Sequence, residues 1–268
     1  MAKTIISKMG KRVRLVLIDL SGTLHIEDEP TPGAVDALKR LQQSSLSLRF
    51  VTNTTKESRA RLHARLTKIG FTVRPEDILS SLWAARELVE RRGLRPLLLL
   101  DAQAEEDFTG LGASGEDEAD SVLVGLAPDK FNYKELNTAF RVLNKGGPLI
   151  AIHQGRYYKR SDGLALGPGP FVKGLEYATN VKPEVVGKPT ELFFRTALGG
   201  VPADEAVMIG DDVRDDIDGA QQVGIRGYLV QTGKYRPGDE TTINPPPHSV
   251  VPSFAEAVEK ILAEAAAS

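Results

Sequence analysis

The sequence predicts an α/β fold with a mainly parallel sheet, and two observations support this prediction. Short apolar runs alternate with segments of helical periodicity along the 268 residues, which is typical of parallel α/β sheets. Two of these runs, near opposite ends of the chain, stop on carboxylates at Asp19 and at Asp211. Because open α/β sheets bind ligands at the carboxyl edge of their strands, we expect Asp19 and Asp211 to meet at one such edge.

The expected strands are the apolar runs, and helices fill the segments between them. The runs lie at residues 13–18, 48–51, 97–100, 122–124, 149–152, 207–209 and 227–230. Thr54 with Glu57 predicts a capping box at the start of a helix that Gly70 ends. In the last helix, Phe254 and Ile261 recur on one face, which predicts packing against the sheet.

The middle of the chain differs in composition from both ends. Residues 110–120 are acidic and rich in Gly, and a Gly-Pro cluster follows at residues 167–170. We interpret residues 80–182 as an inserted α/β domain. Residues 1–79 and 183–268 then form one core between them, since the two strands that end on carboxylates lie on opposite sides of the insertion.

Composition excludes several classes of function. The 34 Lys and Arg against 36 Asp and Glu give a net charge of −2, which removes the electrostatic case for a nucleic-acid or membrane surface. The absence of Cys leaves oxygen atoms or His to hold any metal and fits a reducing compartment. No stretch approaches the roughly 20 apolar residues of a spanning helix, and the first residues lack the long apolar segment of a secretory signal, so we expect a cytoplasmic location. The basic first residues, MAKTIISKMGKRVR, leave a mitochondrial presequence as a less favoured alternative.

Polar residues gather at strand ends and helix starts, in an order that predicts phosphoryl transfer. They are Asp19 with Ser21, Thr52 with Asn53, Lys188, and Asp211 with Asp212 and Asp216. A carboxylate can attack phosphorus and become an acyl phosphate once the negative charges are neutralised. The Lys188 ammonium, the Thr52 hydroxyl and the Asn53 amide supply charge and hydrogen-bond donors. Two carboxylates with a backbone carbonyl suit Mg²⁺.

Each of these features has an ordinary structural explanation when it is considered alone. Asp19 before Gly22 fits a turn, Asn53 fits a strand end, and Lys188 before Pro189 fits an exposed position. The acidic cluster at residues 211–218 fits a solvated first turn of a helix. The shared order and context of the four features favour the chemical interpretation.

The four features resemble the motifs of the haloacid dehalogenase superfamily of phosphohydrolases. DLSGT, VTNTT, VVGKP and MIGDD are similar to its four motifs in order, and YYKRSDGLALGPGPF with QTGKYR points to a narrower group within it. The resemblance implies a Rossmann-like core with a large α/β cap inserted after the second motif. It also makes a homodimer built through the cap plausible, without an exposed apolar stripe in the sequence that decides it.

The resemblance implies a role for each residue of the four motifs. By this resemblance, the nucleophile is Asp19 and its catalytic partner is Lys188. The substrate is bound by Asp19, Ser21, Thr52, Asn53 and Lys188. Mg²⁺ is ligated by Asp19, the Ser21 carbonyl and Asp211, and it is supported, often through water, by a further acid, for which Asp216 is preferred to Asp212. We therefore expect a Mg²⁺-dependent phosphohydrolase that acts through an aspartyl phosphate on small phosphorylated compounds.

Ser21 departs from the superfamily pattern, in which most phosphatases carry Asp at this position as the general acid and base. A positioned acid or base contributes about 10²- to 10⁴-fold, so we expect a loss of that order on alkyl phosphate esters. The leaving groups of pyrophosphate and of N-phosphorylated Lys or His need less protonation, so we expect a smaller loss of activity on these substrates. A role of His25 as a substitute proton shuttle is the less favoured interpretation, and an ordinary loop residue is the favoured one.

Alternatives remain open for the whole chain and for the insertion. Ser21 leaves room for a low-turnover pseudophosphatase with a regulatory or scaffolding role, and a receiver-type phosphoacceptor uses a similar residue set without a large insertion. In the expected cap, which would act as a lid that selects the leaving group, residues 156–160 are basic and aromatic and fit either an anionic substrate or a strand edge. The glycines of residues 167–170 predict close approach of the backbone.

Overall fold

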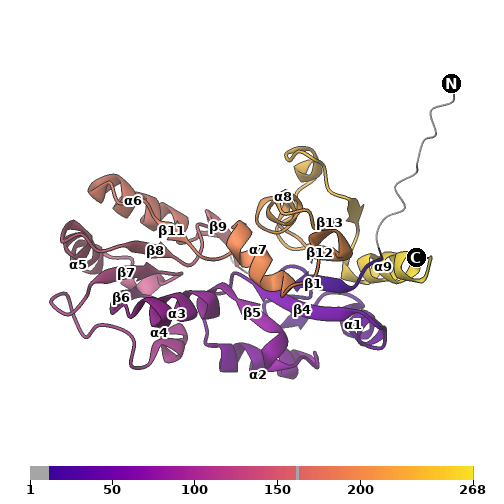
Figure 1. Cartoon of the computed structure of the whole chain (residues 1–268), viewed down its shortest axis with the longest axis horizontal. Coiled ribbons are helices and arrows are strands. Elements are labelled where there is room, and N and C mark those ends of the chain that lie inside the picture. The colour runs from indigo at the N-terminus through magenta and orange to yellow at the C-terminus, as the bar shows by residue number, and fades with distance from the viewer. Residues whose placement is uncertain (1–11, 161–162, 268) are drawn as a thin grey trace.

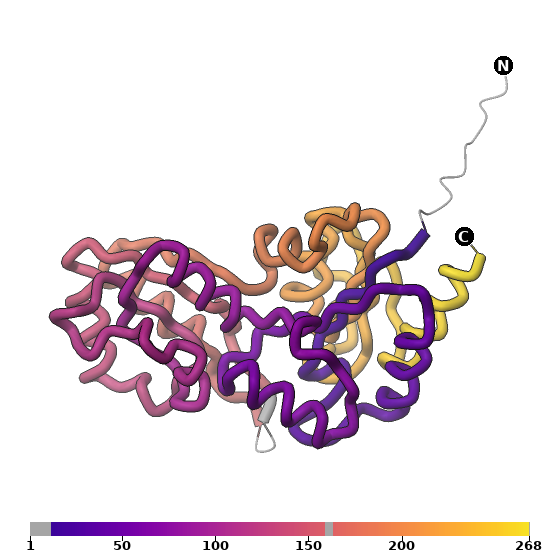
Figure 2. Tube along the Cα trace, turned by 60° about the horizontal axis from the view of Figure 1, so that its bottom comes forward, coloured from indigo at the N-terminus to yellow at the C-terminus, as the bar shows by residue number. Residues whose placement is uncertain are grey.

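The chain forms two lobes, each built on a parallel sheet with helices against it (Figure 1). The computed structural model describes residues 12–160 and 163–267, so most of the basic leader lies outside the described residues. Figure 2 shows that the middle of the chain forms one lobe, while the first and last of the described residues lie in the other. The predicted α/β class with mainly parallel sheets is confirmed.

The larger lobe contains a six-stranded sheet in the order β14-β13-β12-β1-β4-β5, with every pair parallel. Its strands are β1 (Leu15–Asp19), β4 (Ser47–Thr52), β5 (Ile78–Ser80), β12 (Ala206–Gly210), β13 (Arg226–Val230) and β14 (Ser249–Val251). The central strand β1 pairs with β12 on one side and β4 on the other. Segments almost two hundred residues apart in the sequence therefore end at one edge of this sheet.

Helices cover both faces of the larger sheet, and the residues of β1 alternate between two apolar cores. Val16 packs in the core with α1 (Ala34–Gln42), α2 (Arg59–Ile69) and α9 (Phe254–Ala267). Leu17 packs on the other face with α7 (Glu191–Leu198) and α8 (Gly219–Gln222). Because successive side chains of a strand point to opposite faces, a strand buried on both faces is apolar at nearly every position, and Leu15 to Ile18 of β1 form such a run before Asp19.

The ends of α2 confirm one sequence prediction and correct another. Gly70 caps the helix in a left-handed conformation, with φ 110°, as predicted. The predicted capping box is wrong, because Ser58 is the N-cap and its side chain accepts from the backbone N–H of Arg61. Glu57 instead pairs with Arg65 at 2.6 Å. Thr54, the predicted N-cap, lies four residues before the observed N-cap Ser58, so the box pattern lies outside the helix.

The smaller lobe contains a four-stranded parallel sheet in the order β11-β8-β7-β6. Its strands are β6 (Pro96–Leu99), β7 (Ser121–Val124), β8 (Leu149–Ala151) and β11 (Glu184–Val185), and a hairpin of β9 (Tyr157–Arg160) and β10 (Gly163–Leu166) projects from it. Its helices are α3 (Ser81–Arg92), α4 (Ala102–Glu105), α5 (Tyr133–Asn144) and α6 (Gly169–Thr179). Strand β11 pairs with β8, so the smaller sheet extends to Val185, beyond the predicted end of the insertion at residue 182.

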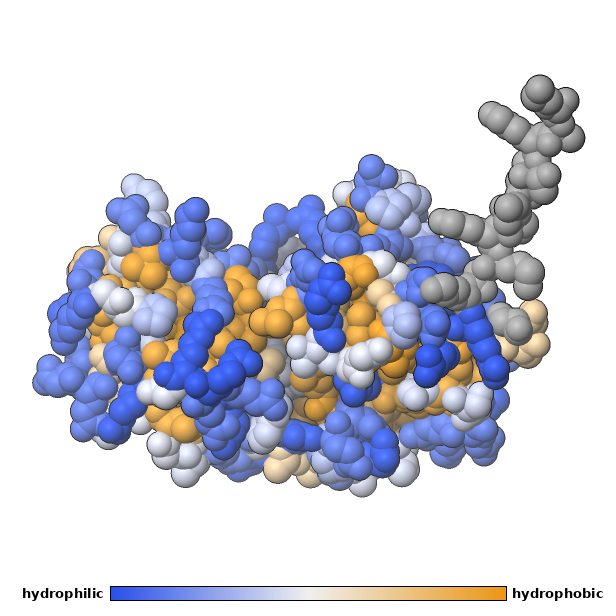
Figure 3. Space-filling view, viewed as in Figure 1, coloured by the Kyte–Doolittle hydropathy of each residue, from blue (hydrophilic) through white to orange (hydrophobic). Residues whose placement is uncertain are grey.

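Short elements complete the structure. They are the hairpin β2 (His25–Ile26) and β3 (Glu29–Pro30), and the short helices η1 (Pro75–Asp77), η2 (Glu106–Phe108), η3 (Pro128–Lys130), η4 (Ala203–Glu205), η5 (Val213–Asp218) and η6 (Asp239–Thr241). The face drawn in Figure 3 is largely hydrophilic over both lobes, with smaller hydrophobic areas between. Among the residues that the structure describes, none of the helices has the length and apolar character needed to cross a membrane.

Candidate active site

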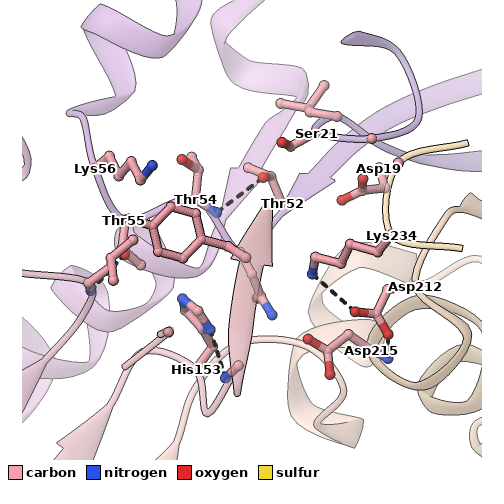
Figure 4. Close-up of a pocket in the computed structure, with 18 of the residues that line it drawn as sticks. Asp19, Ser21, Thr52, Thr54, Thr55, Lys56, His153, Asp212, Asp215 and Lys234 are labelled. Carbon is pink, nitrogen blue, oxygen red and sulfur yellow. Dashed lines mark hydrogen bonds and ion pairs between the residues drawn. The ribbon is translucent and has the colours of Figure 1, made fainter. Parts of the chain in front are cut away.

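A cavity of about 740 Å³ lies where the carboxyl edge of the larger sheet faces the smaller lobe. Asp19 ends β1, Thr52 ends β4, and Asp211 follows β12 directly, and all three line the cavity. Figure 4 shows Asp19 and Ser21 on one side of the cavity, with Lys234 and Asp212 beside Asp19. The structure therefore brings the strand ends together as the sequence predicted.

Lys188 lies between two buried carboxylates at the base of the cavity. Its Nζ is 2.6 Å from Asp19 Oδ1 and 2.6 Å from Asp216 Oδ1. All three residues are at least 95% buried, so water screens these charges poorly. The Thr23 hydroxyl donates to the other Asp19 oxygen at 3.3 Å. Asp19 is thus held in one orientation by a cation and a hydroxyl.

Asp211 completes a cluster of three carboxylates whose oxygens lie within 4.8 Å of one another, together with Asp19 and Asp216. Asp211 Oδ2 accepts from the backbone N–H of Lys234 at 2.7 Å. The backbone of Gly22 packs directly against it, because a Cβ at Gly22 would lie 2.1 Å from Asp211 Oδ2. Gly22 also has φ 97°, so both space and conformation require glycine here.

The pKa values of the cluster show an excess of negative charge. Burial, and then Asp19 and Asp216, raise the pKa of Asp211 well above its ordinary value. Burial raises the pKa of Asp216 to about 7, although Lys188 opposes the rise. Burial would lower the pKa of Lys188, but Asp19 and Asp216 outweigh it and raise that pKa. One ammonium does not balance three carboxylates, and an oxygen-only donor set with surplus negative charge fits a hard divalent cation.

Thr52 and Asn53 occupy different environments although they are neighbours. The Thr52 hydroxyl lines the cavity and accepts from the backbone N–H of Thr54 at 3.1 Å, which leaves its own proton free to donate. The Asn53 amide donates to the Lys188 carbonyl at 3.0 Å, and its oxygen accepts from the Lys188 backbone N–H at 3.0 Å. In this arrangement the Asn53 side chain positions Lys188.

The two acids predicted to support the metal are also placed differently. Asp216 lies in the carboxylate cluster itself, next to Asp19 and Asp211. Asp212 lies at the start of η5, where one carboxylate oxygen accepts from the backbone N–H groups of Arg214 and Asp215. Its other oxygen pairs with Lys234 Nζ at 3.0 Å, as the dashed line in Figure 4 shows. The geometry brings Asp216, and not Asp212, into direct reach of a shared cation.

Three cavity residues received no role from the sequence. The Lys234 backbone N–H donates to Asp211 and its ammonium donates to Asp212. Lys234 lies in the QTGKYR segment, to which the sequence assigns no chemical role. Asp215 lines the cavity, and burial followed by the charge of Asp212 raises its pKa to about 6. His153 follows the predicted strand of residues 149–152, so the rule that selected Asp19 and Thr52 would also have selected it.

His25 and the basic aromatic segment are now placed. His25 lies in β2, is 2% exposed, and its Nδ1 lies 2.8 Å from the Glu27 carbonyl oxygen. Burial, and then Arg65, lower its pKa.

In the segment of residues 156–160, Tyr157 and Tyr158 line the cavity, and Lys56 of the larger lobe lies 4.2 Å from the Tyr158 ring centre. This cation–π contact joins the two lobes beside the cavity.

Comparisons with known proteins show the family of this chain. A family model described as "Haloacid dehalogenase-like hydrolase" matches residues 16–114, and one described as "HAD-hyrolase-like" matches residues 185–257. The chain is 57% identical over 252 residues to haloacid dehalogenase-like hydrolase domain-containing protein 2 of Rattus norvegicus, covering 93% of this chain and 96% of the relative. It is 40% identical over 267 residues to human phospholysine phosphohistidine inorganic pyrophosphate phosphatase, covering 96% and 98%.

Solved structures share the same architecture. The p-nitrophenyl phosphatase from Archaeoglobus fulgidus matches with a TM-score of 0.85 and 26% identity, over 93% of this chain and 99% of that one. The glycerol phosphate phosphatase from Mycobacterium tuberculosis, solved in complex with magnesium, matches with a TM-score of 0.79 and 28% identity, over 90% and 76%. With its four motifs at one sheet edge and relatives along nearly its whole length, the chain belongs to the haloacid dehalogenase-like hydrolase family.

Proposed function

We propose that this chain is a Mg²⁺-dependent phosphatase that acts on small phosphorylated compounds through an aspartyl phosphate at Asp19. The observation that carries the proposal is the position of Asp19, whose carboxylate lies 2.6 Å from the Lys188 ammonium and within 4.8 Å of the Asp211 and Asp216 carboxylates. In this buried arrangement, positive charge can neutralise both the Asp19 carboxylate and the phosphoryl group that it attacks.

The donor set fits Mg²⁺, which prefers oxygen ligands. Asp19, Asp211 and the backbone carbonyl of Ser21 would hold the ion, and Asp216 would support it. When bound, Mg²⁺ supplies the positive charge that lets a carboxylate approach a phosphoryl group. The raised pKa values of Asp211 and Asp216 support this assignment, because a second cation would relieve the repulsion that causes them.

The residues of the chain account for the remaining chemistry. An Asp19 oxygen attacks phosphorus, the bond from phosphorus to the leaving group breaks, and the leaving group keeps the electron pair. Lys188 and the Thr52 hydroxyl stabilise the negative charge on the phosphoryl oxygens, while Asn53 holds Lys188 in place. Water then attacks the acyl phosphate, which releases inorganic phosphate and restores Asp19.

Position 21 limits the choice of substrates. The exposed Ser21 has a hydroxyl that ionises far above neutral pH and cannot serve as a general acid. We therefore infer slow turnover of alkyl phosphate esters and better turnover of pyrophosphate or of phosphoramidates, whose leaving groups need less protonation. The human relative named for phospholysine, phosphohistidine and pyrophosphate supports this choice.

Ser21 also favours a second candidate, a low-turnover pseudophosphatase that keeps the site for a regulatory or scaffolding role. Phosphate release from pyrophosphate, a phosphoramidate and 4-nitrophenyl phosphate, measured with and without Mg²⁺, separates the two. Release that requires Mg²⁺ and disappears in Asp19→Asn supports the phosphatase. Binding of fluoroberyllate with Mg²⁺ but no release from any of the substrates would support the second candidate, and release by Asp19→Asn at the original rate would overturn both.

Four further predictions stay open to experiment. We propose that residues 80–182 form a cap domain over a core of residues 1–79 and 183–268, with a boundary within a few residues of these limits. We also propose that the cap closes as a lid over the site, that the chain is cytoplasmic, and that it forms a homodimer.

A further inference from the structure

His153 lies on the opposite side of the cavity from the phosphoryl site. It follows β8, whose carboxyl edge faces the larger lobe, and it lines the same cavity as Asp19 and Lys188. Figure 4 draws its ring below Thr52 and away from Ser21. In phosphoryl transfer the leaving group departs roughly opposite the attacking oxygen, so we infer that a leaving group displaced by Asp19 lies on the side of the cavity away from Asp19, where His153 is.

The hydrogen bonding of His153 fixes the position of its proton. Its Nδ1 lies 3.1 Å from the backbone nitrogen of Gly155, and a backbone N–H can only donate, so Nδ1 is the acceptor. Burial, and then the charges of Lys234 and Lys188, lower the pKa of His153 to about 3, so the ring is neutral. A neutral ring that accepts at Nδ1 carries its single proton on Nε2.

The backbone of the turn that follows His153 is tightly packed, which fixes the position of the Gly155 N–H that the ring accepts from. The Gly169 N–H donates to the Gly155 carbonyl at 3.0 Å, and a Cβ at Gly167 would lie 2.2 Å from that same oxygen. A Cβ at Gly155 would lie 2.9 Å from His153 Nδ1. The glycines of residues 167–170 thus allow the close approach that the sequence predicted, and the backbone they approach is the turn that carries His153.

We propose that His153 Nε2–H is a fixed hydrogen-bond donor to the leaving-group oxygen, and that it makes the enzyme selective for substrates with an oxygen bridge to phosphorus. The proposal rests on the proposed function and assigns a substrate class to the same site. A bridging oxygen has lone pairs that gain charge as the bond to phosphorus breaks, so a donor there stabilises the transition state. A protonated phosphoramidate nitrogen has no lone pair to accept this bond.

For pyrophosphate, the chemistry balances without transfer of a proton from His153. Asp19 bonds to one phosphorus, the bridging P–O bond breaks, and orthophosphate leaves with the electron pair on the former bridging oxygen. His153 keeps its proton and donates a hydrogen bond to that oxygen. This neutral donor assists a leaving group that is stable as an anion, and it does not replace the acid that an alkoxide leaving group requires.

The test compares two substrates in the Mg²⁺-loaded full-length protein. In His153→Ala, we expect kcat/KM for pyrophosphate to fall by about 10²-fold, the lower range for removal of one preorganised donor, with less than about 3-fold change for a phosphoramidate. Gly155→Ala keeps the imidazole but displaces it, and we expect the same selective loss. His153→Gln offers an amide donor at the Nε2 position, and we expect partial recovery on pyrophosphate.

The controls separate this proposal from the proposed function. His63→Ala changes a histidine of α2 outside the cavity and should leave the ratio of the two kcat/KM values unchanged. Equal losses on both substrates in His153→Ala, or no loss on pyrophosphate, would overturn the role of His153. If the unaltered protein releases phosphate from neither substrate with Mg²⁺, the proposed function itself fails.

Discussion

Replacement of Lys188 by Met tests the electrostatic centre of the site, because Met keeps an unbranched chain and removes the charge together with its hydrogen-bond donors. Lys188 Nζ contacts carboxylate oxygens of Asp19 and Asp216 at 2.6 Å each. At an effective dielectric constant of about 20, unit charges at this distance attract by about 6 kcal/mol. The cost of burying the charges offsets much of this, and removal of one partner of a buried ion pair costs about 3–5 kcal/mol.

We therefore expect Lys188→Met to lower the free energy of unfolding by about 3–5 kcal/mol in the absence of metal. Mg²⁺ should restore part of this loss, since the ion supplies positive charge to the same carboxylates. Urea unfolding with EDTA and with Mg²⁺ measures both effects. Turnover should fall by about 10²- to 10³-fold even with Mg²⁺, because the donor to the transition state is missing.

The double variant Lys188→Met with Asp216→Asn provides the matched control. Asparagine removes the charge that Lys188 leaves unpaired, so the double variant should be more stable than Lys188→Met alone. An unchanged urea midpoint for Lys188→Met in EDTA, with turnover retained in Mg²⁺, would refute the reasoning. It would mean that the ammonium neither balances the buried carboxylates nor assists the chemistry.

Three further predictions concern the metal site and position 21. Ser21→Asp places a carboxylate at an exposed position, and we expect turnover of 4-nitrophenyl or alkyl phosphates to rise by about 10²-fold or more; no gain would mean that this position does not limit the rate. Gly22→Ala would drive a methyl group into Asp211, so Mg²⁺ binding measured by calorimetry should be lost while Gly33→Ala, at another glycine with positive φ, retains it. Burial raises the pKa of Asp216 from 3.8 to about 7, so its proton stabilises the metal-free fold at low pH and this contribution disappears as the pH rises through about 7. Since Mg²⁺ needs the deprotonated acid, the increase in Tm on adding Mg²⁺ should be larger at about pH 8 than at about pH 6, and an equal increase at both would contradict the raised pKa.

Much of the larger sheet was predictable because a buried parallel strand is apolar along most of its length. The run at residues 13–18 became β1, and the run at residues 207–209 lies within β12. Strands β5, β11 and β14 were not predicted, since each has only two or three residues and carries no periodic signal of its own. Their pairing partners define them as strands.

The candidate site was predictable where a residue follows a recognisable strand, and less so where a side chain chooses among partners. Asp19, Thr52 and Asp211 lie at the expected edge. Sequence spacing did not show that Asn53 bonds the backbone of Lys188 or that Lys234 pairs with Asp212. These contacts join segments that only folding brings together.

The sequence by itself determined the kind of chemistry, because residue types at strand ends fix which groups reach the shared edge of a parallel sheet. Tertiary structure alone decided which acids share one cation and what faces them from the other lobe. Asp216 joins Asp19 through Lys188, and His153 presents one ring nitrogen because Gly155 occupies the other. Both outcomes depend on distances between segments remote in sequence, which no local pattern encodes.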